Sequence, residues 1–252
     1  MTPPPLPPYE KSPWNAWWTL LWAFGLLVIW QLTLGLGMSM FLLLDGSYFE
    51  SPGDFSALMD RFSELALDGD AIGMSSFLTI FVVCPVCWLL GKVRPHWSGW
   101  EYLGVNSVRW WQWPLWAGIT YGLGTLFGLL GPSLGLDEMD ESMVQMAEST
   151  DYAILLILGV AIAAPLVEEF IFRGVVYRGW RASKMGLSGT LVLTSFLWTI
   201  LHVQYPFPIL CFLFVFGIIL GLAREWTGNI WIPVWMHFVN NAIASFGMLS
   251  AT

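Results

Sequence analysis

The sequence is poor in charged side chains. Asp, Glu, Lys and Arg make up 11% of its 252 residues, while hydrophobic residues make up 56% and the mean hydropathy is +0.65. Soluble domains carry about 25% charged residues, so this composition predicts an integral membrane protein. The formal net charge of −8 argues against nucleic acid as a partner.

Cysteine is also scarce, with three residues in the chain. Cys84 and Cys87 have the C-x-x-C spacing, but they lie inside an apolar run and no second pair completes a tetrahedral zinc site. A thiol inside a membrane span is not exposed enough for redox chemistry. We interpret both as small buried residues of a helix.

No cleavable signal peptide is evident at the N-terminus. Residues 1–17 are rich in proline, which favours extended backbone, and no short apolar region with a small-residue exit follows them. We expect a proline-rich cytoplasmic tail over residues 1–17, followed by a single transmembrane domain over residues 18–252.

Long apolar runs, in contrast, are abundant. A membrane-spanning helix needs about 20 mainly apolar residues. Seven segments are candidates: 18–44, 71–91, 113–131, 152–173, 187–203, 209–223 and 230–249. The predicted fold is therefore an all-α, polytopic transmembrane helical bundle of about seven spans, with six or eight as alternatives.

The connecting segments alternate in charge. Residues 45–70 and 132–151 are acidic, whereas residues 92–109 and 173–184 are basic. Cytoplasmic loops are enriched in Lys and Arg, so we expect a cytoplasmic N-terminus and acidic loops on the outer side. Residues 54–67 form either an amphipathic surface helix or a solvated loop.

Two adjacent carboxylates and an arginine end the fourth apolar segment. An ionised side chain in the hydrocarbon core costs roughly 2.5–3.5 kcal/mol on the mildest scale. Glu169 and Arg173 are one helical turn apart and in the favourable order for an ion pair. Glu168 points about 100° away from Glu169 and has no cation nearby in the sequence. This predicts one structural carboxylate and one free carboxylate.

Two of the three histidines lie inside late apolar segments. His202 follows Trp198 by one helical turn, and Asn241 follows His237 by one turn. His96 lies in a basic segment beside Trp and Pro, where we expect an interfacial side chain. Ionisable groups within a membrane are candidates for a functional site.

These residue types allow several kinds of site. A glutamate and a histidine can activate water, and a second histidine with an asparagine can stabilise an oxyanion. Glu168, His202 and His237 are also a possible two-His, one-carboxylate metal set. A proton or ion pathway and a purely structural polar network remain alternatives.

The order of these motifs resembles a known family. Glu168-Glu169-x-x-x-Arg173, then Trp198-x-x-x-His202, then His237-x-x-x-Asn241 is similar to the pattern of the CAAX prenyl protease and bacteriocin-processing (Abi) family. The resemblance covers roughly residues 152–249. One departure is Trp198, where many members have Phe.

The resemblance implies an intramembrane endopeptidase whose catalytic part is residues 152–249. By that resemblance, Glu168 and His202 activate water, while His237 and Asn241 stabilise the oxyanion. Glu169 and Arg173 would support the site. Both a divalent metal such as zinc and a metal-free mechanism are open, and the sequence contains no His-Glu-x-x-His motif.

The same resemblance implies a multi-pass protein of a prokaryotic plasma membrane that acts on a membrane-associated peptide or protein. It does not select the natural substrate. Two alternatives remain: a proton- or ion-coupled transporter that uses Glu168, and an inert scaffold of the same fold.

The predicted span ends conflict with a shared site. At about 1.5 Å per residue, Glu168 lies about 24 Å from residue 152, and His202 lies about 22 Å from residue 187. Because consecutive spans run in opposite directions, these ends place Glu168 near the inner face and His202 near the outer face. The family pattern requires them to be close.

Overall fold

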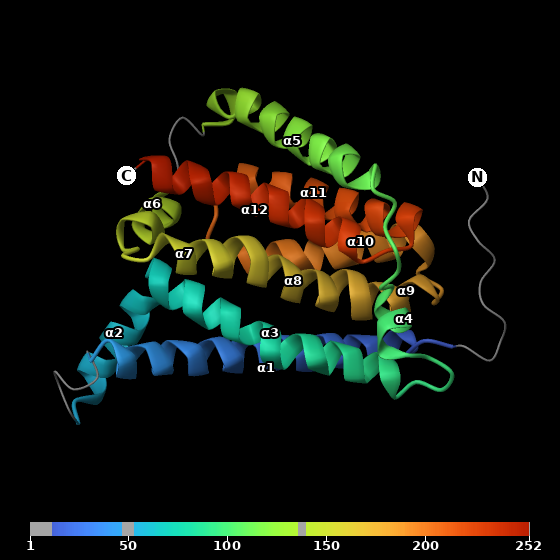
Figure 1. Ribbon diagram of the computed structural model, residues 1–252, viewed down its shortest axis with the longest axis horizontal. Coiled ribbons are helices and arrows are strands. Elements are labelled where there is room, and N and C mark those ends of the chain that lie inside the picture. The colour runs from blue at the N-terminus through green and yellow to red at the C-terminus, as the bar shows by residue number, and fades with distance from the viewer. Residues whose placement is uncertain (1–11, 47–52, 136–139, 252) are drawn as a thin grey trace.

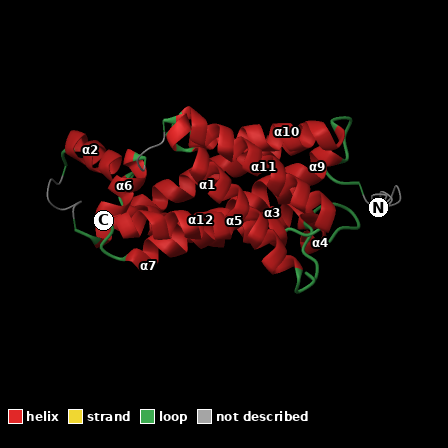
Figure 2. Ribbon diagram, turned by 90° about the horizontal axis from the view of Figure 1, so that it is seen from above, coloured by secondary structure: helices red, strands yellow, loops and turns green. Residues whose placement is uncertain are grey.

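The described part of the chain is entirely helical apart from turns and loops. The computed structural model describes residues 12–46, 53–135 and 140–251, and these contain no strand (Figure 2). The all-α prediction is therefore confirmed. Most of the predicted proline-rich tail, residues 1–11, lies outside the described residues, as do parts of both predicted acidic loops.

All seven predicted segments are helical. The helices that correspond to them are α1 (Ala16–Leu44), α3 (Gly69–Lys92), α5 (Gln112–Leu130), the continuous helix Ala153–Arg181, α10 (Gly186–Thr199), α11 (Phe207–Thr227) and α12 (Trp231–Ala251). Shorter helices connect them: α2 (Phe55–Leu65), α4 (Gly99–Leu103) and α6 (Glu141–Glu148). The amphipathic helix expected within residues 54–67 is thus present as α2.

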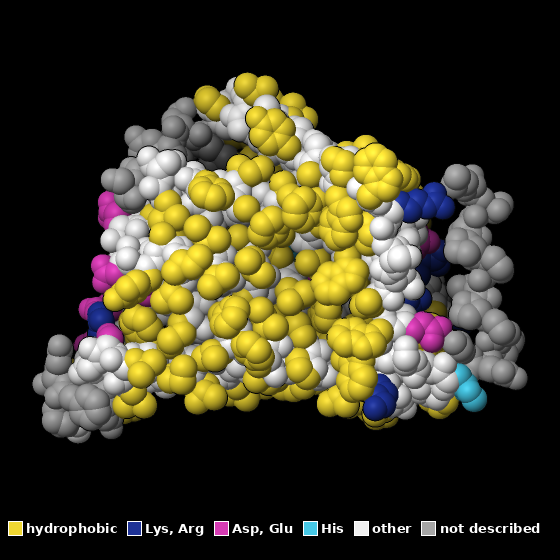
Figure 3. Space-filling view, in the orientation of Figure 1, with side chains coloured by type: hydrophobic (Ala, Val, Ile, Leu, Met, Phe, Trp, Pro, Cys, Tyr) yellow, Lys and Arg dark blue, Asp and Glu magenta, His cyan; other side chains and the backbone are white. Residues whose placement is uncertain are grey.

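Four of these helices are long and apolar enough to cross a membrane. They are α1, α3, Ala153–Arg181 and α11, while α10 with its final turn is a shorter apolar helix. Hydrophobic side chains cover a broad band of the surface, and charged side chains gather toward its two ends (Figure 3). The chain is a membrane protein, and the number of its crossings remains a prediction.

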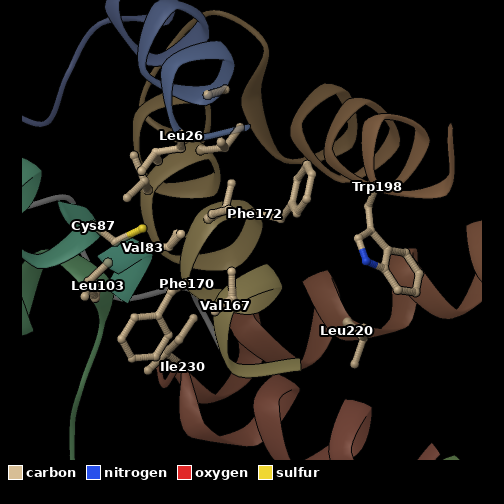
Figure 4. Close-up of a cluster of buried hydrophobic side chains, with 14 of the residues drawn as sticks. Leu26, Val83, Cys87, Leu103, Val167, Phe170, Phe172, Trp198, Leu220 and Ile230 are labelled. Atoms are coloured by element: carbon tan, nitrogen blue, oxygen red, sulfur yellow. The ribbon is translucent and has the colours of Figure 1, made fainter. Parts of the chain in front are cut away.

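The helix Ala153–Arg181 is the centre of the bundle. α1 and α3 pack on one side of it and α12 on the other (Figure 1). Of the four candidate spans, it has the largest share of its apolar window buried inside the protein. Buried side chains from several helices meet around it, including Leu26, Val83, Phe170, Trp198 and Ile230 (Figure 4).

This central helix is not a regular α-helix. It consists of α7 (Ala153–Leu156), α8 (Ala164–Glu169) and α9 (Tyr177–Arg181), joined by π-helical segments at Ile157–Ala163 and Phe170–Val176. π-helical segments are rare and are frequent at functional sites.

Close contact with α3 needs small residues on both helices. A β-carbon at Gly159 would meet the backbone of Gly73, and a β-carbon at Gly73 would meet the backbone around Leu155. The absence of side chains at these two glycines lets the first π segment lie directly against α3.

The helix that contains the fourth predicted span is longer than the span itself. The span was predicted to end at residue 173, whereas the helix continues to Arg181. Those basic side chains find partners inside the bundle: Arg173 pairs with Glu169, and Arg178 donates to the carbonyl of Tyr102. Partnered arginines therefore allow the helix to extend beyond the predicted boundary.

This extension removes the conflict between the two motifs. Measured from the turn at residues 182–185, Glu168 lies about 20 Å along one helix and Trp198 about 18 Å along the next, at about 1.5 Å per residue. The two residues are therefore at the same depth, in agreement with the hydrogen bond between them. Glu168 lies midway along the helix Ala153–Arg181, and not near its end.

Candidate active site

Three parts of the bundle supply the predicted site residues. α8 carries Glu168 and Glu169, the end of α10 and its last turn carry Trp198 and His202, and α12 carries His237 and Asn241. The exposed fraction is 5% for Glu168, 0% for Glu169 and 2% for His237. His202 and Asn241 are half-buried, so the polar group extends from a closed interior toward a more accessible side.

Glu169 is the structural carboxylate of the pair. Arg173 Nη1 lies 2.9 Å from Glu169 Oε1, and both side chains are fully buried. The predicted i, i+4 ion pair is therefore confirmed. Arg173 also donates through Nη2 to the carbonyl of Gly217 on α11, at 3.1 Å, which ties the central helix to its neighbour.

His237 completes this arrangement, which the sequence did not predict. Its Nδ1 lies 3.0 Å from Glu169 Oε1, the oxygen that Arg173 also contacts. An ionised carboxylate only accepts, so Nδ1 carries a proton. Glu169 thus fixes the ring of His237 and directs its Nε2 toward Glu168, whose Oε2 is 3.9 Å away. That distance is too long for a direct hydrogen bond.

Glu168 has no arginine or lysine partner among the described residues, as predicted. Its Oε2 accepts a hydrogen bond from the indole N–H of Trp198. The carboxylate therefore has one indole donor and one histidine ring nearby, and it interacts with the charge of Arg173 without forming an ion pair. This is a much weaker compensation than the one Glu169 receives.

Trp198 lies between the two motif histidines. Its ring centroid is 5.1 Å from that of His202 and 5.2 Å from that of His237, and both contacts are edge-on. The guanidinium of Arg173 lies 5.2 Å from the indole centroid, a cation–π distance. Trp198, the aromatic residue of the second motif, therefore contacts both motif histidines and Arg173 as well as Glu168.

The orientation of His202 follows from a backbone contact. Its Nδ1 lies 3.0 Å from the carbonyl oxygen of Trp198. A carbonyl only accepts, so Nδ1 carries a proton, and Nε2 is the acceptor in the neutral ring. The ring of Tyr205 stacks on His202 at 6.3 Å between centroids.

Tyr205 is a neutral hydroxyl beside this histidine. Burial raises the pKa of its phenol, with smaller contributions in the same direction from the negative charges of Asp140 and Glu168. The phenol therefore stays protonated and remains able to donate a hydrogen bond at neutral pH. The sequence analysis did not single out this residue.

Asn241 is held by the first π segment. Its Nδ2 donates to the carbonyl of Val160 at 2.9 Å. In this segment the N–H of Ala164 bonds five residues back, to Gly159. The next partner of this pattern would be the N–H of residue 165, which is proline and has no N–H. Pro165 thus leaves the carbonyl of Val160 available to Asn241.

The residues proposed as a metal set do not converge on a metal-sized site. Among the described residues, no group of three or more His, Cys, Asp or Glu side chains is arranged to hold a metal ion. Glu168 Oε2 accepts from the indole of Trp198, and the hydrogen bond of His202 is to the backbone carbonyl of Trp198. The two-His, one-carboxylate set therefore does not fit a metal in this conformation.

The family comparison agrees with the position of this site. Residues 150–243 match the model of the Rce1-like family, described as type II CAAX prenyl endopeptidase Rce1-like. The match agrees with the family resemblance drawn from the three motifs, and the matched region contains every residue of the candidate site.

Two bacterial proteins are similar over part of their length. YpbD of Bacillus subtilis, an uncharacterized protein, is 35% identical over 97 residues, which are 38% of this chain and 44% of that protein. An uncharacterized 24.3 kDa protein of Escherichia coli is 37% identical over 114 residues, 43% of this chain and 52% of that protein. The chain spans about half the length of these relatives. No solved structure matches.

Proposed function

We propose that this protein is an intramembrane endopeptidase that hydrolyses peptide bonds of membrane-associated peptides or proteins. The observation that carries the proposal is Glu168. It is a buried carboxylate without an ion pair to Arg or Lys. His237 lies 3.9 Å away, Trp198 connects it to His202, and the surrounding region matches a prenyl endopeptidase family. A carboxylate without an ion-pair partner is costly in an apolar bundle. A role as general base explains why such a residue is present.

In the proposed reaction, Glu168 and His202 activate a water molecule. One of them takes a proton from the water, and the resulting hydroxide adds to the carbonyl carbon of the substrate. The same proton then passes to the leaving amine as the C–N bond breaks. The acceptor nitrogen of His202 is Nε2, because Nδ1 is bound to the carbonyl of Trp198.

His237 and Asn241 are the proposed donors to the oxyanion. Nδ1 of His237 is bound to Glu169, so Nε2 donates only when the ring is an imidazolium. Such an imidazolium would have Glu169 and Glu168 on its two sides. Asn241 uses one N–H for Val160 and has a second one for the oxyanion.

We favour the metal-free form of this mechanism. The support is the donor geometry, because the described residues offer no three-ligand set and Glu169 already occupies one nitrogen of His237. Under this form, a chelator leaves cleavage unchanged. Loss of cleavage with a chelator and its return with added zinc would replace it with a metal-dependent form.

The alternative of a proton- or ion-coupled transporter is not favoured. It shares Glu168 with the peptidase, but the match to a prenyl endopeptidase model supports hydrolysis. Vesicles that contain the purified protein provide a direct test. The peptidase proposal expects no proton flux that depends on Glu168.

The proposal is tested by comparing membranes of cells that express wild-type protein with membranes that express Glu168→Ala. Mass spectrometry of new peptide N-termini should reveal at least one cleavage that is present with wild type and absent with the variant. Immunoblotting must show equal amounts of both proteins. Identical sets of N-termini would contradict the proposed function.

A further inference from the structure

Trp198 makes contacts with the proposed water-activating groups that packing alone does not require. Its indole N–H bonds to Glu168, and its backbone carbonyl accepts from Nδ1 of His202. Trp198 therefore binds both of the proposed water-activating residues. Its side chain binds Glu168, and its main chain binds His202. No other described residue contacts both in this way.

We propose that Trp198 is a positioning residue whose indole N–H orients the carboxylate of Glu168 for water activation. This inference rests on the proposed function. With Oε2 held by the indole, Oε1 is the oxygen left for water. Accurate placement matters, because a misplacement of about 1 Å can cost about a hundredfold in rate.

The acceptor distinguishes this tryptophan from the others. The indoles of Trp14, Trp180 and Trp235 donate to backbone carbonyls. The buried Nε1 atoms of Trp22 and Trp88 have no hydrogen-bond partner among the described residues, so the fold accommodates indoles without satisfying their N–H groups. The donor at Trp198 is instead directed at the carboxylate of the adjacent pair that forms no ion pair with Arg173.

Trp198 does not act on the substrate directly. Its exposed fraction is 0%, and it is enclosed by the rings of Phe216, His202 and His237. An effect of its N–H on cleavage must therefore pass through Glu168. Loss of the indole N–H should therefore change kcat and should not change substrate binding.

Trp198→Phe is the sharpest variant, because it keeps a six-membered aromatic ring and the backbone carbonyl while it removes the indole N–H together with the smaller ring. Hydrogen bonds to charged groups are worth about 1.5–3 kcal/mol, so kcat should fall about ten- to a hundredfold. KM should not change. Trp22→Phe is the matched control, which removes an N–H without a partner and should leave both constants unchanged.

The assay uses purified protein in nanodiscs and a synthetic peptide that spans the cleavage site found in the membrane comparison. In a Glu168→Ala background, Trp198→Phe should cause no further loss. A normal kcat for Trp198→Phe, or a further loss in the Glu168→Ala background, would overturn the inference. If wild type and Glu168→Ala cleave equally, the proposed function fails and the inference fails with it.

An NMR measurement separates these failures without relying on activity. In protein with ¹⁵N-labelled tryptophan, the indole resonance of Trp198, assigned by its loss in Trp198→Phe, should shift in Glu168→Ala. The Trp22 resonance should stay in place. An unchanged Trp198 resonance would remove the hydrogen bond and the inference, while the peptidase proposal would still stand on its own test.

Discussion

Two polar clusters involve the central helix of this protein, and they differ in whether each carboxylate has a cationic partner. The core cluster lies midway along the helix and consists of Glu168, Glu169, Arg173 and His237. The helix-end cluster lies one to two turns farther along and consists of Tyr177, Arg181 and Glu225. Both clusters connect helices, but only one leaves a carboxylate without a cation.

In the helix-end cluster the single carboxylate is fully compensated. Glu225 accepts hydrogen bonds from the guanidinium of Arg181 and from the hydroxyl of Tyr177. Both charged side chains are partly exposed, at 29% for Arg181 and 18% for Glu225. This cluster therefore connects α9 to α11 through an ion pair and a hydrogen bond.

The core cluster has two carboxylates and one arginine in a closed interior. Glu169 takes the arginine and the first nitrogen of His237, and Glu168 receives only an indole N–H. Glu168 therefore has no ion pair that stabilises the fold, and its hydrogen bond with Trp198 connects α8 to α10. The comparison supports a structural role for the helix-end cluster and is consistent with the proposed chemical role of Glu168 in the core cluster.

After Glu168 itself, the largest expected difference in turnover concerns His202. Proton transfer by a positioned side chain contributes about 10²–10⁴-fold, so His202→Ala should lower kcat by that order while the protein remains folded. Tyr177→Phe, in the helix-end cluster, should leave kcat unchanged. Rates with the identified peptide measure both. Equal losses in the two variants would remove the distinction between the clusters.

The next effect is on stability, and it concerns Arg173. Removing it leaves Glu169 as a buried carboxylate without its cation, which costs about 3–5 kcal/mol. Arg173→Ala should therefore lower the thermal midpoint in detergent and the yield in membranes. Arg173→Lys, which retains the charge, should recover part of this loss. A midpoint equal to wild type would mean that the ion pair does not hold the fold.

Asn241 should have a smaller effect on turnover than the water-activating groups. Losing one oxyanion donor typically costs about 10²–10³-fold, so Asn241→Ala should retain weak cleavage that is measurable above Glu168→Ala. Asn240 donates to Oδ1 of Asn241 at 3.1 Å, and Asn240→Ala serves as a comparison with a smaller loss. Full activity of Asn241→Ala would refute its oxyanion role.

The smallest effect belongs to Arg181. Exposed ion pairs contribute about 0.2–1 kcal/mol, so Arg181→Ala should reduce stability by no more than about that amount and should leave kcat unchanged. Thermal unfolding of Arg181→Ala beside Arg173→Ala measures the contrast. If Arg181→Ala is the more destabilising variant, the buried pair of Glu169 and Arg173 does not stabilise the fold more than the partly exposed pair of Arg181 and Glu225.

Much of the fold could be predicted because a membrane constrains the sequence strongly. The seven apolar segments correspond to seven helices, and the spacing of Glu169 and Arg173 gave their ion pair correctly. Both predictions depend on local sequence. The extent of the fourth helix beyond residue 173 could not be predicted, because Arg173 and Arg178 are satisfied by groups that are distant in the sequence.

The details of the site depend on contacts between distant segments. Trp198 and Glu168 are 30 residues apart, and His237 and Glu169 are 68 residues apart. The sequence marked Trp198 only as an aromatic position at which Phe is common in similar proteins. Pro165 was a readable signal for the free carbonyl that Asn241 binds, but only once the π-helical register is known.

The most direct test of this account compares Glu168→Gln with Glu225→Gln. Each variant neutralises one buried or half-buried carboxylate and keeps its size, and each should yield folded protein. We expect Glu168→Gln to lose almost all cleavage of the identified peptide, while Glu225→Gln retains the wild-type kcat with a slightly lower thermal midpoint. Wild-type cleavage by folded Glu168→Gln would contradict the claim that the unpaired carboxylate performs the chemistry.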